Sequence, residues 1–201
     1  MTMGHIDWAM AMIAMARESA DLNVCYINCK CSVCAMNRNR IVHEARALKS
    51  DYLLFVDTDL QFPPDALRRL LTIAIEKQAA IVGCAYLRRS WPFPVLAVGL
   101  GNGKADAQAR GVVEVARLPT GLMMIDLAIF DRLKKPYFAY PLAEDLPDGI
   151  VTEDYPFCDN VREVGGHIYL DTDLSLEVKH WGQMAVQWHD DEKGYRTIVG
   201  G

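Results

Sequence analysis

The most restrictive feature of the sequence is an uninterrupted apolar run, Tyr52–Val56, which ends in the acidic triplet Asp57-Thr58-Asp59. A run of this length without polar alternation is typical of a strand that is covered on both faces. Pro63 and Pro64 follow and predict the first turn of a helix, because proline is tolerated there. The chain therefore has to fold around a buried strand whose carboxyl end carries two carboxylates.

Helical and strand patterns alternate on both sides of this run. Apolar spacing predicts helices over residues 6–20, 37–48, 63–77, 126–133 and 152–165, the first of them buried on more than one side. Strands are expected at residues 22–32, 79–86, 118–125 and, from a period-2 pattern at Leu174, Leu176 and Val178, within 167–180. Residues 91–117 read as a hairpin or loop and 136–151 as a loop. This alternation predicts an α/β fold with a mostly parallel sheet flanked by helices.

Composition excludes several classes of protein. The chain has 201 residues, the size of one domain, and 21 Lys plus Arg against 26 Asp plus Glu give a net charge of -5. A general binder of nucleic-acid backbones is normally basic, so that class is disfavoured. No apolar run approaches the ~20 residues of a membrane span, and the start lacks the basic region of a signal peptide. Six cysteines without a secretory signal predict a reducing compartment, hence a cytoplasmic location.

The two aspartates predict a metal and phosphate site. Ligands of open α/β sheets bind beyond the carboxyl ends of the strands. Two carboxylates one residue apart can share a hard divalent cation and leave its other positions to phosphate oxygens. Sugar transfer from a nucleotide-sugar uses such a site, and so does phosphoryl transfer with Asp57 as the nucleophile. The residues Leu60-Gln61 after the triplet disfavour the second chemistry, because haloacid-dehalogenase-like phosphatases usually place a spacer and a Thr or Val there.

A set of motifs in fixed order resembles the GT-A-fold glycosyltransferases of the family 2 kind. The triplet with its strand resembles their DxD region, and Arg38-Asn39 resembles the segment that precedes it. Pro119-Thr120-Gly121 resembles an acceptor-side strand, Glu153-Asp154 resembles the "ED" helix, and His180-Trp181-Gly182 resembles the histidine that closes the metal site. Together these matches cover about residues 36 to 182.

The resemblance implies a role for each matched residue. Asp59 and His180 would bind Mn²⁺ or Mg²⁺, and Asp57 would contact the metal through water or the ribose. Asp154 would be the base that deprotonates an acceptor hydroxyl, positioned with Glu153, which implies inversion at the sugar. Arg38 and Asn39 are expected on the side of the donor, a UDP-sugar or GDP-sugar. The acceptor class (glycan, protein, lipid or modified base) and the oligomeric state are left open.

The remaining segments complete the predicted organisation of a single catalytic domain. Residues 1–90 form the nucleotide and metal half, 91–182 the acceptor half, and 183–201 a tail or lid with Trp188, His189 and Tyr195. Arg88, with its neighbour Arg89, is a candidate for binding diphosphate.

Two further patterns look chemical and are predicted to be structural. Asp171-Thr172-Asp173 repeats the acidic triplet. The cysteines at 25, 29, 31 and 34 lack the paired spacing of zinc ribbons and are expected to be small buried residues, three of them on one face of a strand. A zinc site there is the weaker alternative.

One departure from the family pattern concerns the start of the chain. Members usually begin with a strand that helps to hold the nucleotide base, whereas this chain opens with a predicted helix, so the sheet is expected to be shortened on that side. Two readings other than a glycosyltransferase stay open: a phosphotransferase with Asp57 as nucleophile, and a binding module for nucleotides or carbohydrates without catalysis.

Overall fold

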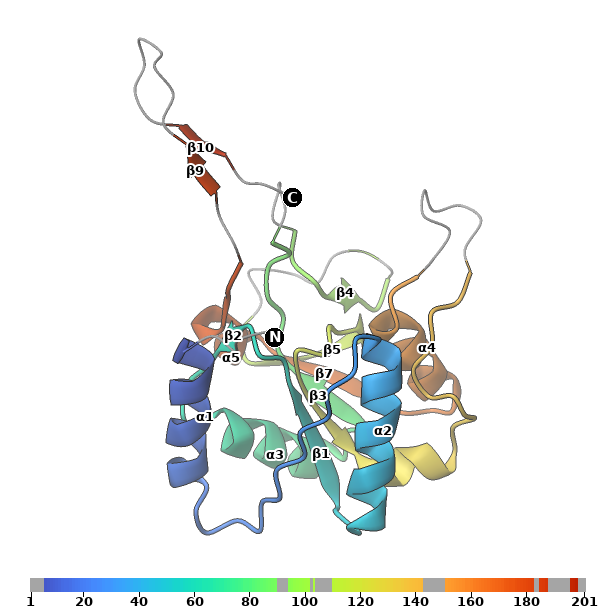
Figure 1. Cartoon of the computed structure of the whole chain (residues 1–201). Coiled ribbons are helices and arrows are strands. Elements are labelled where there is room, and N and C mark those ends of the chain that lie inside the picture. Colours follow the sequence, from blue (N-terminus) through green and yellow to red (C-terminus); the bar gives the residue numbers. More distant parts are fainter. Residues whose placement is uncertain are drawn as a thin grey trace.

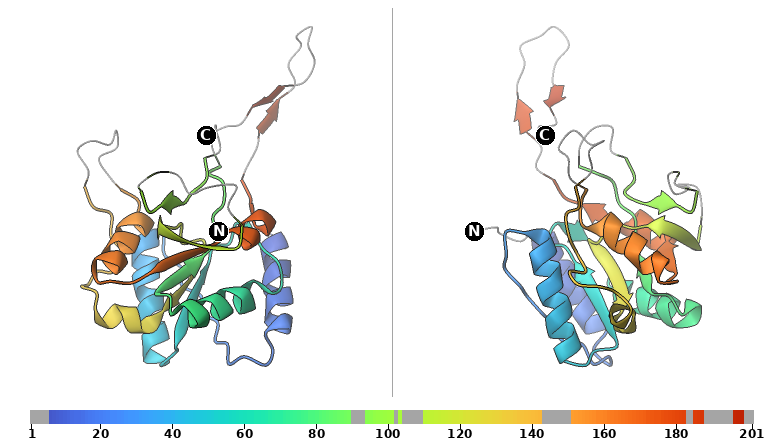
Figure 2. Two further views of the ribbon diagram at one scale, coloured as in Figure 1. Left: turned by 180° about the vertical axis from the view of Figure 1, so that it is seen from behind. Right: turned by 90° about the vertical axis from the view of Figure 1, so that its right-hand side faces the viewer.

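The computed structural model of the chain is built around one six-stranded sheet with helices on both faces (Figures 1 and 2). It describes residues 6–89, 94–101, 103, 110–142, 151–182, 185–187 and 196–198. No helix among these residues is long and apolar enough to cross a membrane.

The sheet has the spatial order β1-β6-β3-β7-β5-β4. Its strands are β1 Tyr52–Val56, β3 Ile81–Gly83, β4 Val98–Gly99, β5 Val112–Arg117, β6 Leu122–Asp126 and β7 Ile168–Asp171. Only β3 and β7 pair in parallel, and the other four neighbouring pairs are antiparallel. The prediction of a mostly parallel sheet is therefore wrong. Hydrophobic periodicity reports burial but not direction, and β6 enters antiparallel between two strands that run the same way.

Each face of the sheet has its own hydrophobic core. On one face lie α2 Cys34–Ala47, α4 Asp154–Glu163 and the 3-10 helix η1 Leu127–Asp131. On the other lie α1 Ile6–Glu18, α3 Ala66–Lys77 and α5 Thr172–Glu177. In β1, Leu53 and Phe55 face the first core and Leu54 packs on the second. The continuous apolar run is thus a strand covered on both faces, as predicted.

Three predicted elements differ from the structure. Helix α1 packs on one side only, since Ile6, Met10 and Ile13 are more than half exposed. Residues 22–32 form no strand, because their backbone pairs with no strand in the described part of the chain. The period-2 pattern after β7 belongs to helix α5, which Asp171 begins by accepting a hydrogen bond from the Leu174 amide.

A short two-stranded ladder, separate from the six-stranded sheet, was not predicted from the sequence. Strand β2 Leu60–Gln61 pairs antiparallel with β8 Lys179–His180, with Leu60 opposite His180. A further two-stranded ladder joins β9 Ala185–Gln187 and β10 Arg196–Ile198. The ladder of β2 and β8 places His180 next to the acidic triplet that precedes β2.

Candidate functional site

The candidate site lies beyond the carboxyl end of β1, where a glycine allows three segments to meet. The Gly121 carbonyl accepts a hydrogen bond of 2.8 Å from the Asp57 amide, and the Gly121 amide donates one of 2.9 Å to the Tyr86 hydroxyl. A Cβ on residue 121 would collide with the Tyr86 hydroxyl and lie 3.0 Å from Leu60 Cδ1. Gly121 is therefore needed to place Asp57 beside Tyr86.

Arg38 lies between two carboxylates from distant parts of the chain. Its Nε donates to Glu153 Oε1 at 2.9 Å, and its Nη2 lies 3.5 Å from Asp57 Oδ1. The guanidinium stacks over the Phe55 ring, with its carbon 5.2 Å from the centroid. The side chains of Arg38 and Glu153 are 7% and 9% exposed, whereas that of Asp57 is 42% exposed. Asp57 thus pairs with Arg38, and its side chain is partly buried and partly exposed.

Burial and the neighbouring charges shift the pKa values of Glu153 and Asp57 in opposite directions. Burial alone would raise the pKa of Glu153, but the charge and hydrogen bond of Arg38 outweigh burial and lower it. The pKa of Asp57 is raised by burial and by the negative charges of Asp59 and Glu153, against the opposing effect of Arg38. The pairing with Arg38 thus favours the anionic form of Glu153.

The second aspartate of the triplet faces a histidine and an arginine. Asp59 Oδ2 lies 3.6 Å from His180 Nε2 and 2.7 Å from Arg89 Nη1. Burial raises the pKa of Asp59, but the interaction with His180 and the charge of Arg89 together outweigh burial. The net shift of the pKa is therefore downward. The pairing of β2 with β8 supplies this geometry, because it sets His180 opposite the residue after Asp59.

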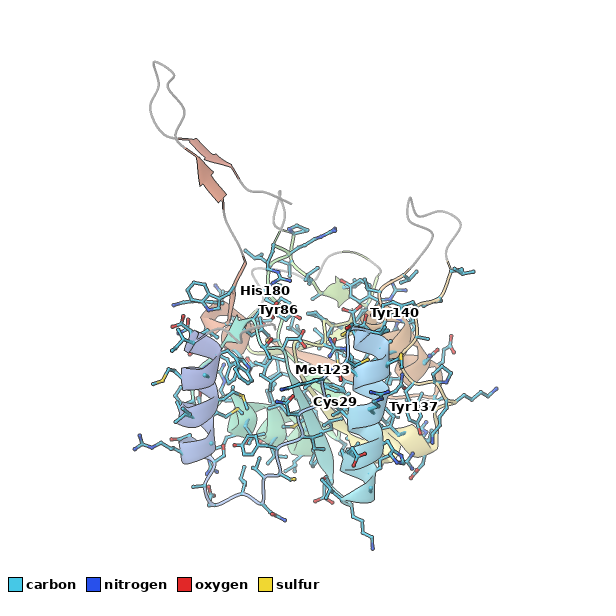
Figure 3. All side chains as sticks on the ribbon, viewed as in Figure 1. Cys29, Tyr86, Met123, Tyr137, Tyr140 and His180 are labelled. Carbon is cyan, nitrogen blue, oxygen red and sulfur yellow. The ribbon has the colours of Figure 1, made fainter. Side chains whose placement is uncertain are left out.

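The backbone fixes which nitrogen of His180 carries a proton. Nδ1 lies 2.8 Å from the Leu87 carbonyl oxygen, which can only accept a hydrogen bond, so Nδ1 is the donor. The ring also packs edge-on against Tyr86, with centroids 4.7 Å apart, and both side chains point to the same end of the sheet in Figure 3. Because Nδ1 is bound to the backbone, Nε2 is the ring nitrogen on the side of Asp59 and the one that could bind a metal ion. Anchoring of the other ring nitrogen is usual for a metal-ligating histidine.

Asp59 and His180 could together hold a divalent cation whose other coordination positions are filled by a bound ligand. Two coordination bonds of about 2.1 Å span up to about 4.2 Å, so His180 Nε2 and Asp59 Oδ2, 3.6 Å apart, can share one ion. Among the described residues, no three His, Cys, Asp or Glu side chains gather closely enough to hold a metal alone. Within the described part of the chain, this site thus offers one carboxylate and one imidazole, a set that suits Mn²⁺ better than Mg²⁺.

Asp154 lies at the start of α4 and differs electrostatically from its neighbour Glu153. The Thr152 hydroxyl donates to its Oδ1 at 2.7 Å, and the Tyr155 amide donates to the same oxygen at 3.0 Å. The sequence predicted that the helix begins at Thr152, but in the structure the cap residue is Glu153. Burial raises the pKa of Asp154, and the charge of Glu153 adds to the effect. Of this pair, Asp154 is the more basic carboxylate.

Two predicted binding residues have other surroundings. The Asn39 side chain donates to the carbonyls of Ala35 and Phe138 and accepts from the amides of Tyr137 and Phe138. Its hydrogen-bonding capacity is therefore used to fasten α2 to the segment after η1. Arg88 is exposed, and its amide donates to the Pro94 carbonyl. Its neighbour Arg89, not Arg88, reaches the acidic triplet.

The second acidic triplet has a structural role in this fold. Asp171 caps α5 and pairs with Arg69, while Asp173 accepts from the Gly111 amide. Of the clustered cysteines, Cys25 and Cys34 are exposed and Cys29 and Cys31 are half-buried, so the expectation that they are buried is wrong. Trp188, His189 and Tyr195 lie outside the described residues.

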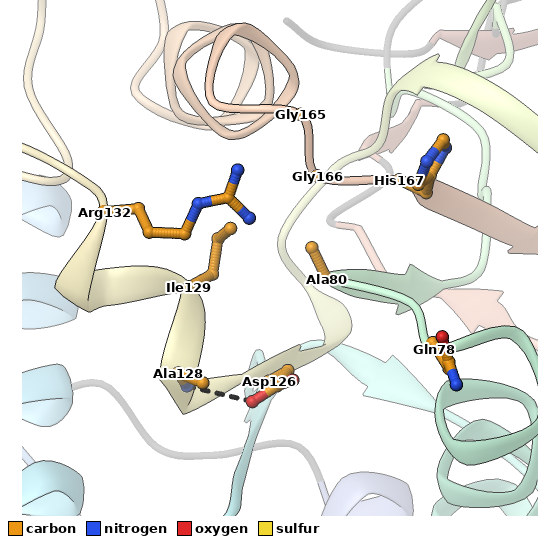
Figure 4. A pocket seen from close by; sticks show the side chains of 9 residues that line it. All are labelled: Gln78, Ala80, Asp126, Ala128, Ile129, Arg132, Gly165, Gly166 and His167. Carbon is orange, nitrogen blue, oxygen red and sulfur yellow. Dashed lines mark hydrogen bonds between the residues drawn. The ribbon is translucent and has the colours of Figure 1, made fainter.

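A separate pocket of about 150 Å³ lies at the opposite end of the sheet (Figure 4). It is lined by residues that precede β3 and β7 or follow β6, among them Ala80, His167 and Asp126. Because β1 and β6 are antiparallel, Asp126 pairs with the first residue of β1, a full strand away from Asp57. This pocket contains none of the residues of the candidate site.

Comparisons with known proteins gave one family match and similarity to solved structures. The family model described as glycosyl transferase family 2 matches residues 11–108, which include Arg38 and the first acidic triplet. Among solved structures 44 chains match significantly. One is the crystal structure of A197 from STIV, with a TM-score of 0.57 and 16% identity over 86% of this chain and 79% of that one. No curated protein sequence matches the chain significantly.

These findings confirm the resemblance to GT-A-fold glycosyltransferases of the family 2 kind and the α/β fold class. The structural likeness shows the fold alone, whereas the family match supports a glycosyltransferase.

Proposed function

We propose that this chain is a metal-dependent glycosyltransferase that moves a sugar from a nucleoside diphosphate to an acceptor hydroxyl, with inversion. The observation that carries the proposal is the meeting of Asp57, Asp59 and His180 at the end of a buried strand. The match to family 2 supports sugar transfer over phosphoryl transfer from Asp57.

On the donor side, Asp59 and His180 would hold the cation, and Asp57 would contact the ribose, or the metal through water. A divalent cation supplies charge neutralisation of the diphosphate when it is bound. Arg38 pairs with both Asp57 and Glu153 and so keeps the two carboxylates in place. UDP-sugars and GDP-sugars are both compatible with these residues.

On the acceptor side, Asp154 is the general base. The acceptor oxygen attacks the anomeric carbon, the bond from that carbon to the diphosphate oxygen breaks, and the acceptor proton passes to Asp154. Both hydrogen bonds to the Asp154 carboxylate end on Oδ1, so Oδ2 is the oxygen proposed to take the proton. A raised pKa favours Asp154 over Glu153 in this role, because a base is most effective when its pKa approaches the working pH.

This assignment retains the predicted division of one catalytic domain. Residues 1–90 provide the donor and metal side, and 91–182 the acceptor side. The tail 183–201 as a lid, an oligomeric state and a cytoplasmic location stay predictions.

Calorimetric titration of UDP and GDP, with and without Mn²⁺, tests the proposal. We expect one nucleotide to bind in a Mn²⁺-dependent manner to the wild type and to lose that binding in Asp59→Ala. The matched control is Asp173→Ala, the same substitution in the second acidic triplet, which bonds a backbone amide instead. Both variants are checked by circular dichroism.

The alternatives predict other results. Phosphatase activity that needs Asp57 and no sugar donor would favour the phosphotransferase. Nucleotide or carbohydrate binding without turnover, retained in Asp154→Asn, would favour a binding module.

A further inference from the structure

We propose that Arg89 is a resident cation of this site, which pairs with Asp59 when no metal is bound and must leave Asp59 for a divalent cation to bind. The inference rests on the proposed function, because it concerns regulation of the same site. Asp59 would then exchange one cation for another, and the release of Arg89 would be part of donor binding.

The first support is that both cations need the same oxygen. Arg89 Nη1 lies 2.7 Å from Asp59 Oδ2, and the same Oδ2 is the oxygen that lies 3.6 Å from His180 Nε2. An ion between the imidazole and Oδ2 would meet the guanidinium at short range. Because like charges repel, the two positive groups cannot share this position at low cost.

The second support is that the chain provides a seat for the Arg89 side chain. The same Nη1 donates to the Trp181 carbonyl at 3.1 Å, and the Trp181 amide in turn donates to the Asp59 carbonyl at 2.8 Å. A Cβ on residue 182 would lie 3.0 Å from Arg89 Cδ and 3.3 Å from Cγ, so Gly182 leaves room for the arginine stem. Two hydrogen bonds through Trp181 and the space at Gly182 thus hold the Arg89 side chain next to Asp59.

The third support is that the pair can open. The Arg89 side chain is 49% exposed and that of Asp59 is 33% exposed. Ion pairs this close to solvent contribute little net stability, so a divalent cation can displace the guanidinium. A released Arg89 would be available to bind phosphate oxygens of a donor with two parallel hydrogen bonds.

The test measures Mn²⁺ binding directly, by the loss of the electron paramagnetic resonance signal of free Mn²⁺, without nucleotide and without turnover. We compare the wild type with Arg89→Gln, Asp59→Asn and Arg88→Gln. The last is the matched control, since it removes the same charge one residue away but from an exposed side chain. Circular dichroism and thermal unfolding confirm that each variant is folded.

We expect Arg89→Gln to bind Mn²⁺ about 5-fold more tightly than Arg88→Gln, the effect of a half-exposed ion pair. Arg89→Lys should return toward wild-type affinity, because it restores a competing charge. Asp59→Asn should lose binding. Equal Mn²⁺ affinity of Arg89→Gln and Arg88→Gln would overturn the inference.

Titration of UDP and GDP into the same variants separates failure of the inference from failure of the proposed function. Nucleotide that binds without Mn²⁺ and is lost in Arg89→Gln would mean that the arginine replaces the metal. That outcome overturns the competition and leaves a nucleotide-dependent transferase. Absence of both Mn²⁺ and nucleotide binding in every variant, including the wild type, would overturn both.

Discussion

Removing the charge of Arg38 while keeping its volume, as in Arg38→Met, should cost the protein about 3 kcal/mol of unfolding free energy at neutral pH. Loss of one partner from a buried ion pair typically costs about 3–5 kcal/mol, because the other charge is left without a counterion. Glu153, 9% exposed, is that stranded charge. The lower end applies because Asp57, the second partner, is 42% exposed and is solvated by water.

The size of this effect should depend on pH with a defined sign. In the wild type, Arg38 lowers the pKa of Glu153 below its usual 4.5, so the pair stabilises the fold above pH 4.5 and the contribution is lost as the pH falls through the lowered value. In Arg38→Met, burial without a partner raises the pKa of Glu153, which penalises the fold only where the group would ionise. The difference between the two proteins is therefore largest near pH 7 and shrinks below pH 4.5.

Urea unfolding followed by circular dichroism at about pH 7 and about pH 4 measures both quantities. Arg40→Met, an exposed position on the same helix, is the control and should change stability by less than about 0.5 kcal/mol. Adding Glu153→Gln to Arg38→Met should recover stability, since no charge is then stranded. A loss of less than about 1 kcal/mol at neutral pH, or one that is equal at both pH values, would refute the reasoning.

Two further predictions follow from the same site. Gly121→Ala should cost about 2 kcal/mol in urea unfolding, because its Cβ would collide with Tyr86 and crowd Leu60, whereas Gly103→Ala, with nothing within 4 Å, should be tolerated; equal stability of the two would contradict the packing argument. For sugar transfer, kcat/KM should fall on the acid side with an apparent pKa above the usual 3.8 of an aspartate, because the proposed base Asp154 must be ionised and its pKa is raised. Asp154→Asn should lower kcat at least about 100-fold and retain the affinity for nucleotide. A variant as active as the wild type would show that Asp154 is not the base.

The parts of the site that the sequence predicted are those coded by neighbouring residues. An apolar run followed by Asp57-Thr58-Asp59 specifies a buried strand with carboxylates at its end, and the structure has that strand as β1. Asp154 at the beginning of α4 follows in the same way from the acidic pair before a helical pattern. Here local pattern and tertiary position agree, so one determines the other.

The parts that the sequence did not predict depend on pairing between distant segments. Strand β2 has two residues, too few for a periodic signal, yet its ladder with β8 sets His180 against Asp59. The alternation in residues 22–32 is real, since Ile27, Cys29 and Cys31 are half-buried and the residues between them are exposed. Alternation fixes which side chains face inward, but a strand also needs a partner for its backbone, and that information is not local. The period-2 pattern in α5 misled for a related reason, because the cap by Asp171 outweighs three alternating apolar residues.

The charges of the site explain why one arginine is buried and the other exposed. Asp57, Asp59 and Glu153 carry three negative charges when all are ionised. Arg38 lies between Asp57 and Glu153 and balances one of these charges. Two negative charges remain, which the proposed divalent cation would balance, and Arg89 pairs with one of the carboxylates that carry them. A buried Arg89 could not be displaced without stranding its partner, and an exposed Arg38 would leave Glu153 free to take a proton in place of Asp154. The different burial of the two arginines thus matches a fixed support on one side and an exchangeable cation on the other.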